Sequence, residues 1–214
     1  PYDDKLCLNG NCLEYSSGQL AYNGKKISSA VAAEDGEIMS VSLGALKTKW
    51  LVGFVIKNDG AYSGRVFYFN GHKFTPVAGL ENIESTEAGI LGFGGADDDF
   101  LVVYCAYQSL AYRVKNGSVE DIGKFFGIRM TDGGFKAEII KSGEGADTDW
   151  YIFSATASRP RLIKLWQNKT DKIAGAASFS GLFPSSVKSA VFIPVARTSA
   201  KRELLAEVDD GTAK

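Results

Sequence analysis

Residues 95–107 read GADDDFLVVYCAY, and the first six of them recur 50 positions later as GADTDW at 145–150. A degenerate copy, GALKTKW, occupies residues 44–50, so a large aromatic residue stands at positions 50, 100 and 150. Each of these aromatic residues opens an apolar run rich in β-branched and aromatic side chains. Short, nearly continuous apolar runs are typical of strands that are buried on both faces. The repeat therefore predicts equivalent buried strands in successive units.

A second repeated signal is an Asn-Gly pair between alternating apolar residues. It occurs at Asn23-Gly24, Asn70-Gly71 and Asn116-Gly117. Asn-Gly favours a tight hairpin because both turn positions need a positive φ. One further strand is expected before each Gly-Ala turn, at 38–43, 89–93 and 135–140. Each unit is thus predicted to hold four antiparallel strands within about 45 to 50 residues.

Units of this size predict an all-β fold, namely a β-propeller of four, or alternatively five, four-stranded antiparallel blades. A twisted four-stranded sheet cannot cover its own faces, so neighbouring sheets must pack together. We expect a single domain over 1–214, closed by pairing of N- and C-terminal strands. A sandwich of stacked meanders is the structural alternative. The predicted blades are 37–80, 88–126, 134–178, and a composite blade from 187–210 plus 13–30.

One stretch carries a family resemblance. Residues 64–74, GRVFYFNGHKF, resemble the core of a hemopexin-type repeat. Hemopexin-type domains are four-bladed propellers of about this length, so the resemblance implies the same architecture. The repeat pattern indicates a propeller independently of this resemblance.

The overall charge of the chain is balanced. Its 214 residues include 24 Lys and Arg and 25 Asp and Glu, which gives a formal net charge of −1. Nucleic-acid and anionic-membrane binders usually carry a basic excess. The apolar runs are far shorter than the ~20 residues that a membrane-spanning helix needs. We therefore expect no nucleic-acid partner and no membrane span.

The cysteines and two glycosylation motifs suggest the compartment. Cys7 and Cys12 bracket the turn-forming sequence Leu-Asn-Gly-Asn, which favours a local disulfide over a pair of reduced thiols. Asn116 and Asn168 each begin an Asn-x-Ser/Thr acceptor motif. We therefore expect a glycoprotein of the extracellular space or the secretory pathway. Cys105, inside an apolar run, is expected to be a small buried residue.

Repeated aspartates offer a candidate metal site. Asp97, Asp99, Asp147 and Asp149 stand in equivalent turns, and clustered carboxylates can bind Ca²⁺. Aspartate is also common in turns because it caps its own backbone, so a structural role is the alternative. No other cofactor is expected, since the chain lacks a P-loop, a dinucleotide-binding fingerprint and paired Cys-x-x-Cys motifs.

No catalytic residue stands out. The single histidine, His72, follows the Asn70-Gly71 turn and is expected to be an exposed loop residue. A Ser-His-Asp or Cys-His system would have to use it.

Ligand binding is better placed on the loops at the rim opposite the repeated Gly-Ala turns, because these loops differ between units. Aromatic and charged side chains there could stack and form directional hydrogen bonds. The candidate ligand-binding residues are Asp59, Tyr62, Arg129, Arg159 and Arg161.

We therefore expect a non-enzymatic, lectin-like recognition module that binds a protein or glycan through one face. The alternatives are a carbohydrate-active hydrolase with carboxylates at a central funnel and a structural subunit of a larger assembly.

Overall fold

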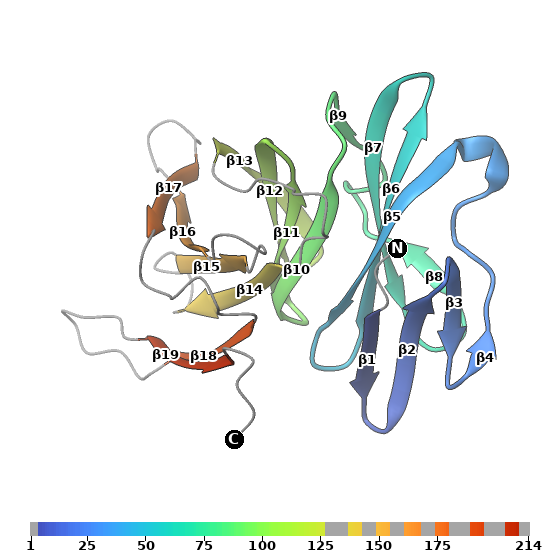
Figure 1. The fold of residues 1–214 in the computed structure, drawn as a ribbon, viewed down its shortest axis with the longest axis horizontal. Coiled ribbons are helices and arrows are strands. Elements are labelled where there is room, and N and C mark those ends of the chain that lie inside the picture. Colours follow the sequence, from blue (N-terminus) through green and yellow to red (C-terminus); the bar gives the residue numbers. More distant parts are fainter. Residues whose placement is uncertain are drawn as a thin grey trace.

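The computed structural model describes residues 4–126, 137–142, 149–154, 161–167, 174–179, 189–194 and 204–209. The described chain is all-β and every strand pairing in it is antiparallel (Figure 1). Within these ranges the only helical element is a 3₁₀ turn, η1 (Ala33–Asp35). No helix in the described chain has the length and apolar character to cross a membrane.

The N-terminal sheet is a meander of four short strands. Its turns at Asn9-Gly10, Ser17-Gly18 and Asn23-Gly24 have positive φ at both central residues, as type I′ hairpins require. Its strands, in spatial order, are β1 (Asp4–Leu8), β2 (Asn11–Ser16), β3 (Gln19–Tyr22) and β4 (Lys25–Lys26).

The second sheet has long central strands and an interrupted outer strand. β8 pairs with one end of β7 and β9 with the other, while the backbone between them bonds to Val66. The strands are β5 (Glu37–Ala45), β6 (Trp50–Asn58), β7 (Ala61–Phe69), β8 (Phe74–Pro76) and β9 (Ile83–Ser85).

The third and fourth sheets repeat the four-stranded meander, and a C-terminal hairpin follows. The third sheet contains β10 (Ile90–Ala96), β11 (Asp99–Cys105), β12 (Gln108–Lys115) and β13 (Ser118–Phe126). The fourth contains β14 (Ala137–Ser142), β15 (Asp149–Ser154), β16 (Arg161–Gln167) and β17 (Ala174–Phe179). The hairpin consists of β18 (Ser189–Pro194) and β19 (Leu204–Asp209).

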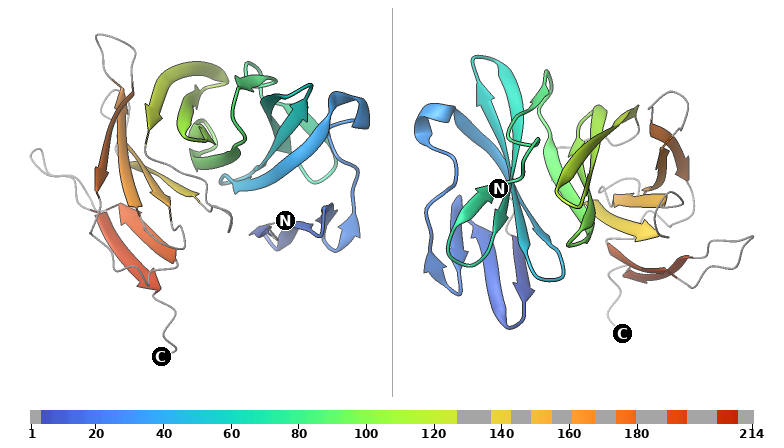
Figure 2. Two further views of the ribbon diagram at one scale, coloured as in Figure 1. Left: turned by 45° about the horizontal axis from the view of Figure 1, so that its top comes forward. Right: turned by 180° about the vertical axis from the view of Figure 1, so that it is seen from behind.

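The first four sheets stack face to face, as the two further views in Figure 2 show. Three apolar clusters fill the three interfaces between them. Along β6, Trp50, Val52, Phe54 and Ile56 belong to the cluster against the N-terminal sheet, while Leu51 and Val55 belong to the cluster against the third sheet. β11 alternates in the same way. The continuous apolar runs are therefore strands buried on both faces, as predicted.

The aromatic residue that opens each repeat packs on the preceding sheet. Tyr22 meets the edge of Trp50 at a ring separation of 5.5 Å, and Tyr68 meets Phe100 at 6.1 Å. The guanidinium of Arg113 lies 5.8 Å from the ring centroid of Trp150. Trp50, Phe100 and Trp150 therefore pack between sheets, because all three are buried in the inter-sheet clusters.

Glycines allow the first strands of neighbouring sheets to approach closely. A Cβ on Gly44 or Gly53 would stand 2.7 Å and 2.6 Å from atoms of the Phe93 ring. A Cβ on Gly94 would collide with the backbone of Ile139 in β14. The second, third and fourth sheets are therefore held tightly together along β5, β10 and β14.

Among the described strands, those of the N-terminal sheet pair only with one another, and β18 pairs with β19. The composite blade from 187–210 plus 13–30, closed by pairing of the chain ends, stays a prediction. The tight hairpin predicted at Asn70-Gly71 needs correction, because this pair lies in a four-residue loop between Phe69 and Phe74, whose backbone amides of His72 and Lys73 donate to the Asn70 side chain.

The N-terminal sheet differs from the second and third sheets because only one of its faces packs against another described sheet. Leu13 and Leu20 belong to the cluster against the second sheet. On the other face, Lys5 and Glu14 form an exposed ion pair at 3.7 Å. Cys7 and Cys12 are cross-strand partners and form the predicted disulfide. A sheet of this kind covers the end of a stack.

Candidate functional site

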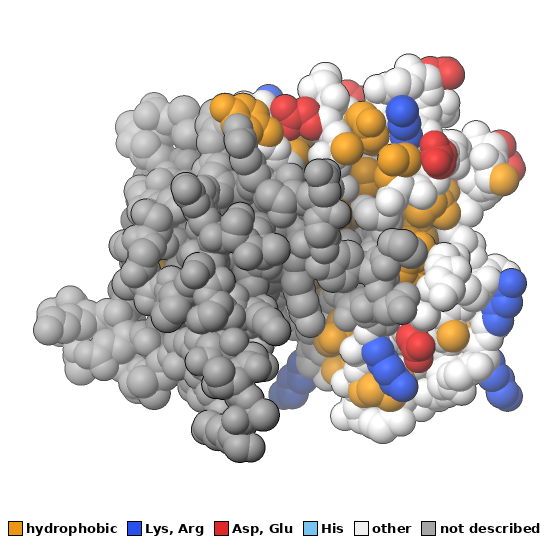
Figure 3. All heavy atoms as spheres, in the orientation of Figure 1, with side chains coloured by type: hydrophobic (Ala, Val, Ile, Leu, Met, Phe, Trp, Pro, Cys, Tyr) orange, Lys and Arg blue, Asp and Glu red, His pale blue; other side chains and the backbone are white. Residues whose placement is uncertain are grey.

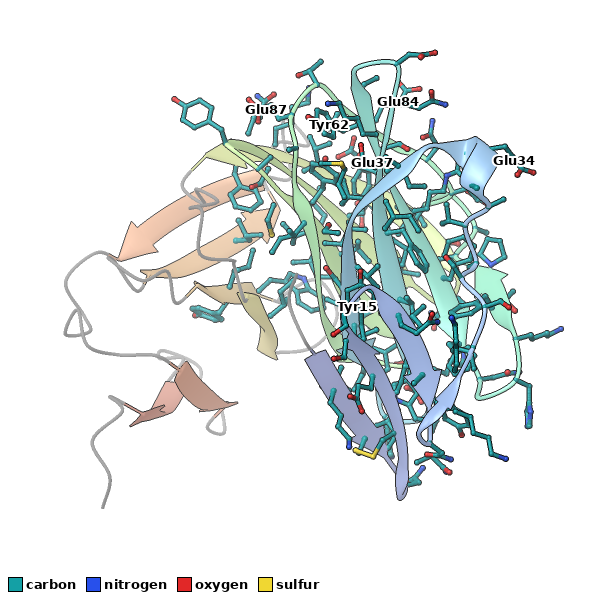
Figure 4. The ribbon with its side chains drawn as sticks, turned by 45° about the vertical axis from the view of Figure 1, so that its right-hand side comes forward. Tyr15, Glu34, Glu37, Tyr62, Glu84 and Glu87 are labelled. Carbon is teal, nitrogen blue, oxygen red and sulfur yellow. A yellow bond between two sulfur atoms is a disulfide. The ribbon has the colours of Figure 1, made fainter. Side chains whose placement is uncertain are left out.

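The most distinctive hollow of the described chain is a groove of about 910 Å³ between the second and third sheets. Its residues come from β7 and β9 on one side and from β12 and β13 on the other. Tyr62, Glu84 and Glu87 lie together at this end of the sheets in Figure 4. The lining comprises Asn58, Ala61, Tyr62, Ser63, Asn82, Glu84, Ser85, Thr86, Glu87, Gln108, Leu110, Tyr112, Asp121 and Lys124.

Tyr104 contacts the segment after β9 that forms part of the groove wall. Its side chain is fully buried, and its hydroxyl donates to the Glu87 carbonyl oxygen at 2.7 Å. The ring fits between Gly64 and Gly89, where any side chain would crowd it. Burial raises the pKa of Tyr104 to about 12, so this phenol keeps its proton and keeps donating at alkaline pH values where a free tyrosine would ionise. The segment that follows β9 is thereby held against the third sheet.

Three carboxylates face the groove, and all three accept hydrogen bonds from neutral donors. Glu87 accepts from the Gln108 backbone amide at 3.2 Å, Glu84 from the Asn82 side chain at 3.3 Å, and Asp121 from the Gly123 amide at 2.8 Å. Neutral donors orient a carboxylate without cancelling its charge. None of the three forms an ion pair with another residue in the described part of the chain.

Two tyrosines give the groove aromatic surface. Tyr62 and Tyr112 are half-buried and pack against the apolar cluster between the two sheets. Burial, together with the nearby charge of Asp121, raises the pKa of Tyr112. The ammonium group of Lys57 lies 5.8 Å from the Tyr62 ring centroid, within the range of a cation–π contact. The groove thus combines aromatic faces with negative charge.

Three of the five predicted ligand-binding residues lie within the described part of the chain. Tyr62 lines the groove, and Asp59 occupies the first position of the exposed type I′ turn between β6 and β7, with a φ of 48°. Arg161 is the first residue of β16, while Arg129 and Arg159 lie outside the described residues.

Glu84, Glu87, Tyr112 and Asp121 line the groove but are not among the predicted ligand-binding residues. Glu84 and Glu87 stand in the Asn- and Glu-containing stretch 81–87, which separates two predicted units. Tyr112 and Asp121 gave no signal of their own, because alternation along a strand does not show where neighbouring sheets leave a gap.

Two of the predicted Ca²⁺ ligands, Asp97 and Asp99, have partners within the fold. Asp97 accepts hydrogen bonds from the backbone amide and hydroxyl of Thr48 at 2.9 and 2.7 Å, and so ties the first turns of the second and third sheets together. Although partial burial acts in the opposite direction, these hydrogen bonds hold the pKa of Asp97 below its ordinary value. Asp99 is buried and forms two hydrogen bonds of 2.7 Å with Arg113.

The other two predicted ligands give no further support to a metal site. Asp149 opens β15, and Asp147 lies outside the described residues. The described residues contain no group of three or more potential metal ligands. The structural alternative for these turns therefore accounts for Asp97 and Asp99.

A second hollow of about 730 Å³ lies between the N-terminal sheet and β5. Tyr15, Ile38, Val41 and Phe54 give it an apolar lining, and Lys26 is its one charged residue. Tyr15 lies far from Tyr62 in Figure 4. With a single charged side chain, this hollow offers fewer ionic contacts to a ligand than the groove.

We predict that Asp99 stabilises the fold by pairing with Arg113. Asp99→Ala removes two buried hydrogen bonds to a charged group and is expected to lower the free energy of unfolding by about 1.5 to 3 kcal/mol, measured by urea denaturation. Asp98→Ala, at an exposed neighbouring position, is the control and should change it by no more than about 0.5 kcal/mol. If Ca²⁺ stabilised the wild type strongly and the Asp99 variant not at all, the metal-binding interpretation would be correct.

We also predict a loss of stability at alkaline pH that depends on Tyr104. In the unfolded chain a tyrosine loses its proton near pH 10, whereas the folded protein holds this proton to about pH 12. The folded state then binds more protons, so stability falls between these pH values, by roughly 2 to 3 kcal/mol. Urea denaturation at pH 9 and above should show a smaller fall for Tyr104→Phe. Tyr107→Phe, at an exposed position, is the control, and equal falls in both variants would contradict the prediction.

Comparisons with known proteins do not assign this chain to a family. No family model matches it, and no curated protein sequence matches it.

Proposed function

We propose that the protein is a non-enzymatic recognition module that binds a protein or glycan ligand in the groove between the second and third sheets. The observation that carries this proposal is the groove itself, which places two tyrosines and three carboxylates around one concave surface. Concave sites with aromatic faces and a few oriented polar groups are typical of ligand recognition. Aromatic residues also contribute disproportionately to binding energy.

The frame of this site is, in our proposal, an open series of propeller-like blades. The stacked four-stranded meanders and their repeated aromatic contacts support a blade-like arrangement. The exposed disulfide and ion pair of the N-terminal sheet support its place at one end of the series. The hemopexin-like stretch at residues 64–74 belongs to the same proposal.

In Figure 3 the Lys, Arg, Asp and Glu side chains of the described part are spread over the visible face without a large patch of one sign.

The binding proposal predicts that substitutions in the groove weaken recognition. A glycan array and a random-peptide phage library are screened with the wild-type chain, and each hit is remeasured with Tyr62→Ala. Loss of the aromatic face should weaken binding about fivefold or more. Tyr15→Ala, a half-buried tyrosine in the second hollow, is the matched control. Hits whose binding depends on Tyr15 and not on Tyr62 would place the binding site in the second hollow instead. An absence of hits would favour a structural subunit.

We further propose that the protein is secreted and glycosylated at Asn116. Asn116 lies in the exposed turn between β12 and β13, with a φ of 49°, and Ser118 follows it at an exposed position. The other candidate, Asn168, lies outside the described residues. The groove residues of β12 and β13 lie toward the other end of the same hairpin, so a glycan on Asn116 would leave the groove open.

Secretion predicts two measurable modifications. After expression through a eukaryotic secretory pathway, the intact mass should fall on treatment with a peptide N-glycosidase, and Ser118→Ala should remove the part contributed by Asn116. Alkylation without reductant should label neither Cys7 nor Cys12. Cys105 is buried and burial raises its pKa, so it should react only after denaturation. An unmodified Asn116 together with free Cys7 and Cys12 would count against secretion.

A further inference from the structure

We propose that the groove between the second and third sheets binds a basic peptide segment of a partner protein, with an Arg or Lys side chain placed between the groove carboxylates and over the tyrosines. This inference rests on the proposed function and specifies the chemistry of its ligand. It follows from the charge of the groove, from an internal contact that resembles the proposed one, and from the desolvation that other ligands would require.

The first step is charge. The lining contains Glu84, Glu87 and Asp121 but only one cationic side chain, Lys124. The whole chain is almost neutral, so this excess of negative charge is local. The three carboxylates have neutral hydrogen-bond donors and no ion-pair partner among the described residues. A cation in the groove would supply the charge that the fold itself leaves unmatched.

The second step is an internal cation. The Lys57 ammonium group already lies over the ring of Tyr62, its cross-strand partner, at 5.8 Å. This contact shows that a cation can lie against a face of the Tyr62 ring. Tyr112 stands across the groove and is the cross-strand partner of Asp121. An arginine of a ligand could stack on a tyrosine and donate to a carboxylate at the same time, because its guanidinium is both planar and charged.

The third step compares ligands. A neutral glycan would cover three carboxylates without matching their charge, which costs free energy. Nucleic acid and acidic peptides would be repelled. The groove is about 910 Å³, lies open to solvent and is built from residues of two sheets. This volume is near the upper end for single small-molecule sites, which favours an extended segment with several side chains.

The test uses a fluorescein-labelled nine-residue peptide of alternating Ser and Arg, measured by fluorescence anisotropy against the complete chain. Two matched peptides replace Arg by Gln or by Glu. The groove variant is Glu84→Gln with Glu87→Gln, in which the side-chain amide oxygen introduced at position 87 can still accept from the Gln108 backbone amide. The control variant is Glu34→Gln with Asp98→Asn, which removes the same charge at exposed positions outside the groove.

We expect the Arg peptide to bind the wild type and the control equally, and the groove variant about tenfold more weakly. Binding should also weaken as salt rises from about 50 to 500 mM, because screening acts on exposed charges. Equal binding to all three proteins, or equal binding of the Gln peptide, would overturn the inference. If the Arg peptide fails while a glycan binds in a Tyr62-dependent manner, the inference fails and the recognition function stands. If neither binds, both fail.

Discussion

The central sheets of this protein are covered on both faces by their neighbours, and the rest of the structure depends on this double burial. A strand that is buried twice must be apolar at every position, as β6 and β11 are along most of their length. Two neighbouring sheets must also approach closely enough to exclude water, which requires glycine where a side chain would collide. Gly44, Gly53 and Gly94 meet that requirement where β5, β6 and β10 face the next sheet.

Among the described residues, polar contacts at the turns complement this apolar packing. Asp97 joins two neighbouring turns through Thr48, and Asp99 pairs with Arg113 inside the third sheet. Arg113 in turn lies against Trp150 of the fourth sheet. The buried pair thus connects the turn of one repeat to the aromatic anchor of the next. The Asp99 carboxylate balances the charge of the buried Arg113 guanidinium, since burying a charge without compensation costs free energy.

The groove is a consequence of the same packing. The first strands of the second and third sheets are in tight contact, whereas the groove is lined by later strands, β7 and β9 against β12 and β13. Tyr104 holds the connecting segment after β9 in place, so the gap keeps its shape. The close packing and the groove therefore lie at different edges of the same two sheets.

The sequence by itself determined the local features: the four-stranded units, the hairpin turns at Asn23-Gly24 and Asn116-Gly117, the Cys7–Cys12 disulfide and the aromatic anchors at 50, 100 and 150. These depend on alternation, turn chemistry and residues close together in the chain. Only the tertiary structure decided the partner of Asp99, the four-residue loop at Asn70-Gly71, the separate N-terminal sheet and the meeting of Tyr62 with Tyr112, Glu84 and Asp121. Those features depend on how one sheet lies against the next. The residue pattern within a single strand does not determine the distance or orientation between neighbouring sheets.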